Sequence, residues 1–329
     1  MNITIALASW SAPVPWRFRL LVLSKAAEDC RTPKPYGSRT ILPPFDFQHF
    51  SNSCITLPAM EEKVELRVYG DDSLPTLIYL PGMHGDWTLI GGFRSTILGR
   101  VRFVEMTYPR TLTWTMDDYA AAIEQALAEQ GISRGWLLGE SFGSQPLWRM
   151  LARGKFAAQG IILAGGFVRH PAHRFMRLMG KITGRISSTL FVKIVFGYAK
   201  FARFRYRDSP QTLSTLDEFI ARRTPADKQA AQYRLNLVAR TDPRPEAMQV
   251  TVPVYALTGF LDPLVPWPLV RRWLRKRCPA FRDFKVIRRA DHNVLNTGTQ
   301  ESVQWILKWM GALPVDGAAE PVKLATIKH

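Results

Sequence analysis

Ser141 lies in the segment Gly-Glu-Ser-Phe-Gly at positions 139–143. An apolar run at 135–138 precedes this segment, and a stretch with helical character at 144–153 follows it. A serine that acts as a nucleophile on a sharp strand-to-helix turn needs Gly two positions before and two positions after it, because the strand and the helix approach closely there. Both positions are Gly, so the segment predicts an exposed nucleophile at Ser141.

Asp262 and His292 are the residues that could activate such a serine. Each follows a short apolar run typical of a buried strand, at 252–257 and at 284–287. A serine hydroxyl is a poor nucleophile at neutral pH. His292 would take its proton as general base, and Asp262 would fix the imidazole tautomer and stabilise the imidazolium. Acyl chemistry is the reaction that this set predicts.

The order Ser141, Asp262, His292 resembles that of the α/β-hydrolase family, in which the acid and the histidine follow the nucleophile along the chain. The resemblance covers roughly residues 64–311. It implies an α/β fold, with a mostly parallel central sheet flanked by helices and a helical cap inserted between late strands. It also implies an oxyanion hole of two backbone N–H groups, which we assign to Phe142 and to Met83 in the Gly-rich loop after a strand at 76–80.

Each of the three catalytic candidates has a second interpretation. Ser141 could be a helix N-cap, because Ser is favoured there. Asp262 could form a turn ahead of Pro263. His292 could be an ordinary loop histidine, with His84 as its rival for the role of base.

Residues near the predicted site have weaker assignments. His84 and Trp87 are interpreted as lining the substrate pocket. Trp148 could line the pocket too, although core packing is the simpler role. Glu140 is expected to face solvent or the pocket edge.

The expected activity is hydrolysis of carboxylic esters or thioesters through an acyl-enzyme on Ser141, because nucleophiles other than Ser characterise the dehalogenases and dienelactone hydrolases of this fold. An acyltransferase or a carbon–carbon bond hydrolase is the alternative within the fold. An inactive binding protein, or a protein that binds membranes or polyanions, is the alternative of another class. No metal-ligand spacing or phosphate-binding loop occurs, so we expect no cofactor and no metal.

Composition and pattern predict how the chain is organised. The 329 residues are 47% hydrophobic, enough for one large core. The predicted parts are an N-terminal extension of poor structure, two parts of the hydrolase core separated by the cap, and a flexible tail. Their bounds are 1–59, 60–166, 167–250, 251–312 and 313–329. The odd count of 3 cysteines favours free thiols and the cytoplasm.

Positive charge is concentrated in the predicted cap. The net charge is +17, and residues 167–207 contain many Arg and Lys but no Asp or Glu. Apolar residues recur beside them at helical spacing. The segment could lie on an anionic membrane as a peripheral contact, attract an acidic substrate, or simply carry a solvated cationic face. The expected partner is a small acyl substrate; no recognised nucleic-acid module is present, so no specific nucleic acid is expected.

Overall fold

The structure is a computed structural model that describes residues 62–174, 205–207 and 209–312. The chain divides into two units, Met1–Ala59 and Met60–His329. The predicted N-terminal extension 1–59 and tail 313–329 lie outside the described residues, as does most of the basic segment 167–207. Those three predictions therefore stay predictions.

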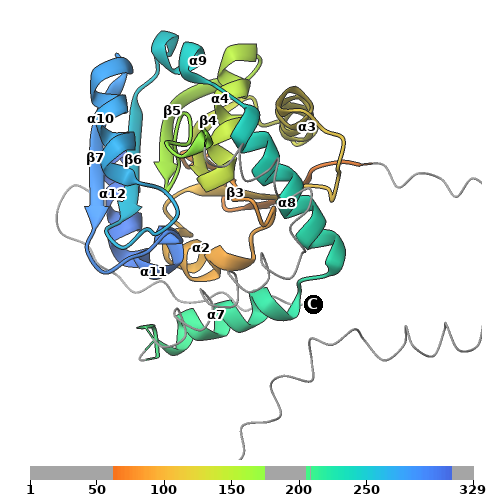
Figure 1. The fold of residues 1–329 in the computed structure, drawn as a ribbon, viewed down its shortest axis with the longest axis vertical. Coiled ribbons are helices and arrows are strands. Elements are labelled where there is room, and N and C mark those ends of the chain that lie inside the picture. Colours follow the sequence, from red (N-terminus) through yellow and green to blue (C-terminus); the bar gives the residue numbers. More distant parts are fainter. Residues whose placement is uncertain (1–61, 175–204, 208, 313–329) are drawn as a thin grey trace, which may run out of the picture. The chain divides into compact units, whose positions relative to one another are not determined.

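A seven-stranded sheet forms the centre of the second unit (Figure 1). Its strand order is β1-β3-β2-β4-β5-β6-β7; β1 runs antiparallel to β3 and every other neighbouring pair is parallel. The strands are β1 (Glu65–Tyr69), β2 (Thr76–Leu80), β3 (Arg102–Thr107), β4 (Arg134–Glu140), β5 (Ala157–Ala164), β6 (Val254–Gly259) and β7 (Phe281–Ile287). The mostly parallel sheet predicted from the sequence is confirmed.

Helices cover both faces of the sheet, as its strand sequences require. Side chains alternate between the two faces of a strand. In β2, Ile78 and Leu80 pack with the α3 and α4 side of the core, whereas Leu77 and Tyr79 pack with the α2 and α12 side. Among the described residues, the α-helices outside the segment between β5 and β6 are α2 (Gly91–Ile97), α3 (Met116–Glu129), α4 (Ser144–Arg153), α10 (Trp267–Arg277), α11 (Val294–Thr297) and α12 (Thr299–Met310).

The start of α3 follows from local sequence. Thr115 accepts a hydrogen bond from the backbone N–H of Asp118, and the Asp118 side chain accepts one from the backbone N–H of Thr115. This capping box satisfies N–H groups that a helix N-terminus leaves without partners. The local sequence around Thr115 and Asp118 therefore accounts for where α3 begins.

The chain between β5 and β6 is here called the insertion (residues 165–253), and its described part contains the helices α7, α8 and α9. These helices are α7 (Pro210–Ala221), α8 (Pro225–Arg240) and α9 (Arg244–Gln249). Helix α8 contacts the short turn η3 (Ser141–Gly143), and α7 contacts η2 (Thr88–Ile90) and α2 (Figure 1). That the insertion acts as a lid remains a prediction. Within the described ranges, no helix has the length and apolarity needed to cross a membrane.

Candidate active site

Ser141 occupies a strained turn between β4 and α4. Its φ is 48°, and among the described residues it is the only one other than Gly with a positive φ. The glycines on either side are needed for space. A Cβ on Gly143 would lie 2.1 Å from the carbonyl oxygen of Leu80, and one on Gly139 would lie 2.9 Å from Cα of Ser144. Tight packing around the turn thus holds the serine in a conformation that costs free energy.

The structure brings together the three residues that the sequence singled out. His292 Nε2 lies 2.9 Å from Ser141 Oγ, and His292 Nδ1 lies 2.8 Å from Asp262 Oδ2. Asp262 follows β6 and His292 follows β7, so both side chains leave the same edge of the sheet as Ser141. The other oxygen of Asp262 accepts hydrogen bonds from the backbone N–H groups of Leu264 and Val265, each at 2.9 Å.

The charges of Asp262 and His292 stabilise each other. Burial on its own would raise the pKa of Asp262. The charge of His292 and hydrogen bonds from His292, Val265 and Leu264 outweigh it and lower that pKa. Burial likewise lowers the pKa of His292, but the charge and hydrogen bond of Asp262 outweigh it and raise the pKa of the imidazole. The pair is thus suited to an imidazole that gains a proton during a reaction.

His170 adds a contact from the insertion that the sequence did not reveal. Its Nδ1 accepts a hydrogen bond from the N–H of Ala172 at 3.1 Å, so Nε2 donates to the carbonyl oxygen of Leu264, also at 3.1 Å. Burial lowers the pKa of His170 and favours this neutral form. His170 therefore holds the loop of residues 260–266, here called the acid loop, which carries Asp262.

The loop after β2, residues 81–85, lies directly against the serine turn; it is here called the oxyanion loop. It closes on itself through a 3.0 Å hydrogen bond from the N–H of Gly85 to the carbonyl of Gly82. A Cβ on Gly143 would lie 2.8 Å from the carbonyl oxygen of Pro81, so the two segments touch. Met83 and Phe142 thus lie on neighbouring segments, and their roles as N–H donors stay predictions.

Two arginines of the insertion hold the oxyanion loop from outside. Arg234 of α8 donates to the carbonyl of Met83 at 3.0 Å. Arg223 follows α7, donates to the carbonyl of His84 at 3.4 Å and forms an ion pair with Asp86 at 2.5 Å. Neither contact could be predicted from the sequence, because a basic residue within a basic insertion carries no local signal of the carbonyl that it contacts.

Glu140 corrects one expectation. Its side chain was expected to face solvent or the pocket edge, but it is 2% exposed and accepts a hydrogen bond from Tyr79 of β2. His84 Nε2 lies 4.0 Å from Glu140 Oε2. Glu140 is the last residue of β4, and its side chain is enclosed because its strand is central in the sheet.

His84 does not occupy the position of the base, because the imidazole beside Ser141 Oγ is that of His292. Burial is the largest cause that lowers the pKa of His84, which favours its neutral form. The His84 ring meets the ring of Phe219 of α7 edge-on, with 5.7 Å between centroids. Its predicted role as a pocket-lining residue stays a prediction.

Trp87 and Trp148 have different environments. The Trp87 ring packs under the guanidinium of Arg67 at 3.5 Å and near that of Arg222 at 4.8 Å. Its pocket assignment also stays a prediction. Trp148 is fully buried and donates to the carbonyl of Phe167, so it belongs to the core.

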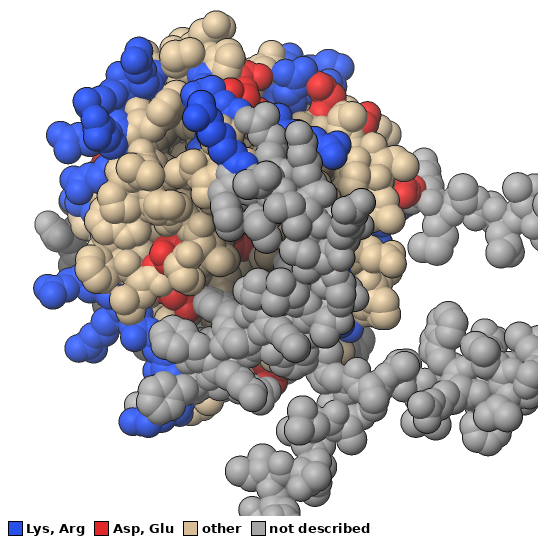
Figure 2. All heavy atoms as spheres, viewed as in Figure 1, with Lys and Arg blue, Asp and Glu red and all other residues tan. Residues whose placement is uncertain are grey.

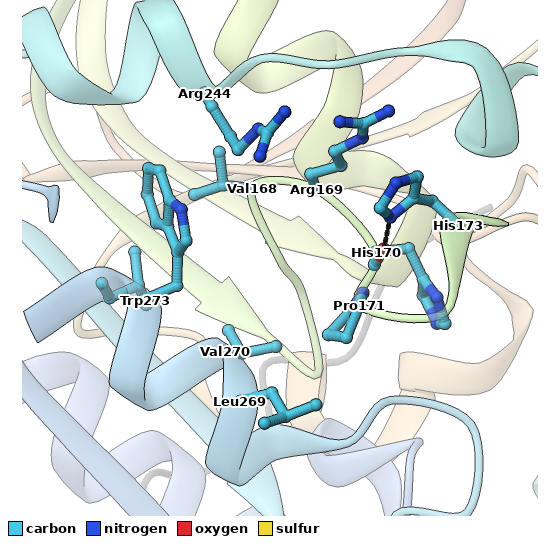
Figure 3. A pocket seen from close by; sticks show the side chains of 10 residues that line it. Val168, Arg169, His170, Pro171, His173, Arg244, Leu269, Val270 and Trp273 are labelled. Carbon is cyan, nitrogen blue, oxygen red and sulfur yellow. Dashed lines mark hydrogen bonds between the residues drawn. The ribbon is translucent and has the colours of Figure 1, made fainter. Parts of the chain in front are cut away.

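A cavity of about 170 Å³ lies between the start of the insertion and α10 (Figure 3). Leu269, Val270 and Trp273 form an apolar wall, and Arg169 and Arg244 lie together on another side. Both arginines pair with one carboxylate, that of Asp242. The cavity touches none of the three triad residues; its link to the site is His170, which also holds the acid loop. The residues that line it are Val168, Arg169, His170, Pro171, His173, Arg244, Leu269, Val270, Trp273 and Leu274.

Lys and Arg side chains gather over α10 in Figure 2. Their positions in the helix are Arg271, Arg272, Arg275, Lys276 and Arg277, and all five are exposed. Basic surface therefore extends beyond the insertion, and membrane association stays a prediction. In the part of the chain that the structure describes, no group of three or more His, Cys, Asp or Glu side chains is arranged to hold a metal ion.

Comparison with known proteins places this geometry in a family. Residues 105–298, more than half of the chain, match the family model described as serine aminopeptidase, S33. No significant match was found among curated proteins.

Solved structures with the same fold share little sequence with the chain. A thermophilic esterase from Thermogutta terrifontis aligns with a TM-score of 0.60 at 18% identity, over 75% of this chain and 93% of its own. An enol-lactonase from Burkholderia xenovorans LB400 aligns with a TM-score of 0.60 at 14% identity, over 75% and 96%. An esterase from Exiguobacterium antarcticum aligns with a TM-score of 0.59 at 13% identity, over 75% and 94%. The sheet topology, these alignments and the family match agree, and the chain belongs to the serine aminopeptidase S33 family of α/β-hydrolases.

Proposed function

We propose that the protein is a serine hydrolase that cleaves carboxylic esters through an acyl-enzyme on Ser141. The observation that carries the proposal is the continuous hydrogen-bonded chain from Ser141 Oγ through His292 to Asp262, with distances of 2.9 and 2.8 Å. These distances suit a base that receives the serine proton and an acid that orients the base.

In the first half of the proposed reaction, Ser141 Oγ attacks the acyl carbon of the ester while His292 Nε2 takes the hydroxyl proton. The electron pair of the carbonyl moves to its oxygen, and the N–H groups of Phe142 and Met83 stabilise the resulting oxyanion. The intermediate collapses when the bond to the leaving alcohol breaks, and His292 returns its proton to that alcohol.

In the second half, a water molecule attacks the acyl-enzyme while His292 takes one of its protons. Collapse of the second intermediate releases the carboxylic acid and returns the proton to Ser141 Oγ. Asp262 stays ionised throughout, because its lowered pKa keeps it charged at neutral pH. It therefore stabilises the imidazolium in both halves.

The relatives support a carboxylic ester as the substrate. Of the three solved structures named above, two are described as esterases and one as an enol-lactonase, and these names refer to enzymes that cleave an acyl–oxygen bond. The family model is named for an aminopeptidase, whose amide substrate would use the same acyl-enzyme. Transfer of the acyl group to another acceptor, or cleavage of a carbon–carbon bond, is the alternative within the fold.

Labelling with a fluorophosphonate tests the activated serine directly. Intact-mass analysis should show one adduct on the wild-type protein, no adduct on Ser141→Ala, and labelling slowed by several orders of magnitude on His292→Ala. If folded wild-type protein gave no adduct, the proposal would fail and a binding protein without catalysis would become the better explanation.

Product analysis then identifies the reaction. Matched p-nitrophenyl esters and aminoacyl p-nitroanilides separate ester from amide hydrolysis. Faster turnover of the anilides would replace the ester proposal by an aminopeptidase. A competing alcohol or thiol that accepts most of the acyl group would identify an acyltransferase.

A further inference from the structure

Arg234 of α8 is one of the largest fully buried side chains of the protein, with 1% of its surface exposed. Its guanidinium donates to the carbonyl of Met83 at 3.0 Å, to the carbonyl of Pro109 at 2.8 Å and to the hydroxyl of Tyr119 at 3.2 Å. All three acceptors are neutral. The ring of Tyr108 also lies 5.5 Å from the guanidinium carbon.

No carboxylate in the described ranges forms an ion pair with Arg234. Arg223, which holds the same loop, is paired with Asp86. A buried charge without a counter-ion is costly, because the protein interior replaces the hydration of the ion only in part. Arg234 therefore places a positive charge behind the oxyanion loop that has no ion-pair partner among the described residues.

Gly85 shows how closely the guanidinium approaches the loop backbone. Its φ is +85°, and a Cβ at this position would lie 2.3 Å from Nη1 of Arg234 and 2.7 Å from Cζ. The carbonyl of Gly85 is fixed by the N–H of Tyr108 at 2.8 Å. The guanidinium can therefore pack against the loop backbone only because residue 85 is glycine.

We propose that Arg234 is a positioning residue of the reaction, whose buried charge stabilises the oxyanion of the tetrahedral intermediate while its hydrogen bonds fix the oxyanion loop. The proposal rests on the proposed acyl-enzyme function. A fixed cation in a site of low dielectric acts on charge that develops nearby without having to reorganise, so it favours the intermediate over the neutral substrate.

A purely structural role would join α8 to the core through the same three hydrogen bonds. The two roles differ in what a substitution preserves. Arg234→Lys keeps the charge but cannot reach three acceptors, whereas Arg234→Gln keeps a single donor nitrogen but removes the charge. Arg240→Gln is the matched control, because Arg240 is an exposed arginine of the same helix.

The experiment measures kcat and KM for ester hydrolysis by the full chain, together with inhibition by a trifluoromethyl ketone and by the methyl ketone of the same shape. Ser141 Oγ adds to the carbonyl carbon of the trifluoromethyl ketone, its proton passes to His292, and the carbonyl oxygen becomes an anion. The methyl ketone reports binding without that charge.

Arg234→Gln should lower kcat and weaken trifluoromethyl ketone binding by similar factors, about ten- to a hundredfold. Its KM and its affinity for the methyl ketone should change by no more than about twofold, because neither depends on the oxyanion. The kcat of Arg234→Lys should stay within about fivefold of the wild-type value, because the charge is kept. The kcat of Arg240→Gln should equal that of the wild type.

Equal losses of kcat in folded Arg234→Gln and Arg234→Lys, or wild-type kcat in Arg234→Gln, would overturn the proposal. If Arg234→Gln does not fold, the kcat of Arg234→Lys is the test: a loss within about fivefold supports a role for the charge, and a larger loss in the folded variant contradicts it. Wild-type protein that a fluorophosphonate does not label would instead remove the proposed function, whatever Arg234 does.

Discussion

The acid loop and the oxyanion loop lie on either side of Ser141 and are held in different ways. The acid loop is held mostly by its own backbone, through the N–H groups of Leu264 and Val265 on Asp262, with His170 as an added contact. The oxyanion loop is held by guanidinium groups that lie about 140 and 150 residues further along the chain. In the proposed reaction, proton transfer would therefore depend mainly on local structure, whereas stabilisation of the oxyanion would depend also on how the insertion packs on the core.

Asp262→Asn should have the largest effect on activity, and it should change only the acid loop and its contact with His292. Asn donates to Nδ1, so the proton of His292 moves to Nε2 and the imidazole can no longer accept the proton of Ser141. We expect kcat to fall by about 10⁴-fold with the fold intact. Steady-state kinetics with circular dichroism measures this; a loss under about tenfold would contradict the role of Asp262.

The dependence of activity on pH tests the pairing of His292 with Asp262. Only neutral His292 can act as base, and Asp262 holds its pKa above the ordinary value of 6.5. Activity should therefore be full well above this pKa and fall as pH drops through it, at least about thirtyfold by pH 5. Loss of the Asp262 charge removes the cause that raises this pKa, so residual activity of Asp262→Asn should have a lower midpoint. A flat wild-type profile from pH 5 to 8 would count against His292.

Gly85→Ala tests the oxyanion-loop side. An alanine Cβ would meet the guanidinium of Arg234 and strain a backbone with φ of +85°, so the loop must shift. We expect kcat about tenfold lower and the free energy of unfolding lower by about 1 to 2 kcal/mol, with the pH midpoint unchanged. Kinetics and denaturant unfolding provide the measurements.

Gly131→Ala is the control for that variant. Gly131 has φ of +67° with no atom near its Cβ position, so alanine there adds only backbone strain. It should lower stability without changing kcat. If Gly85→Ala and Gly131→Ala had the same kcat as the wild type, the exact position of the oxyanion loop would not matter for the reaction.

The sequence predicted those parts of the molecule whose signal is local. The glycines on either side of Ser141 and the apolar strand runs each act on neighbours in the chain, and the strand and helix that they predict are present. The enclosure of Glu140 was missed, because its burial depends on the strands that pair on either side of β4. Arg223 and Arg234 were missed as well. An arginine that binds a carbonyl and one that faces water have the same sequence pattern until the insertion is placed on the core.

The left-handed backbone of Ser141 has a consequence for how sequences of this fold can change. A non-glycine residue with a φ of 48° costs about 1 to 3 kcal/mol, and glycine would relieve that cost at once. Selection for stability alone would therefore favour glycine at position 141, and under the proposed function selection for catalysis would oppose that change. With serine at this position, the protein is less stable than the same fold would be with glycine there.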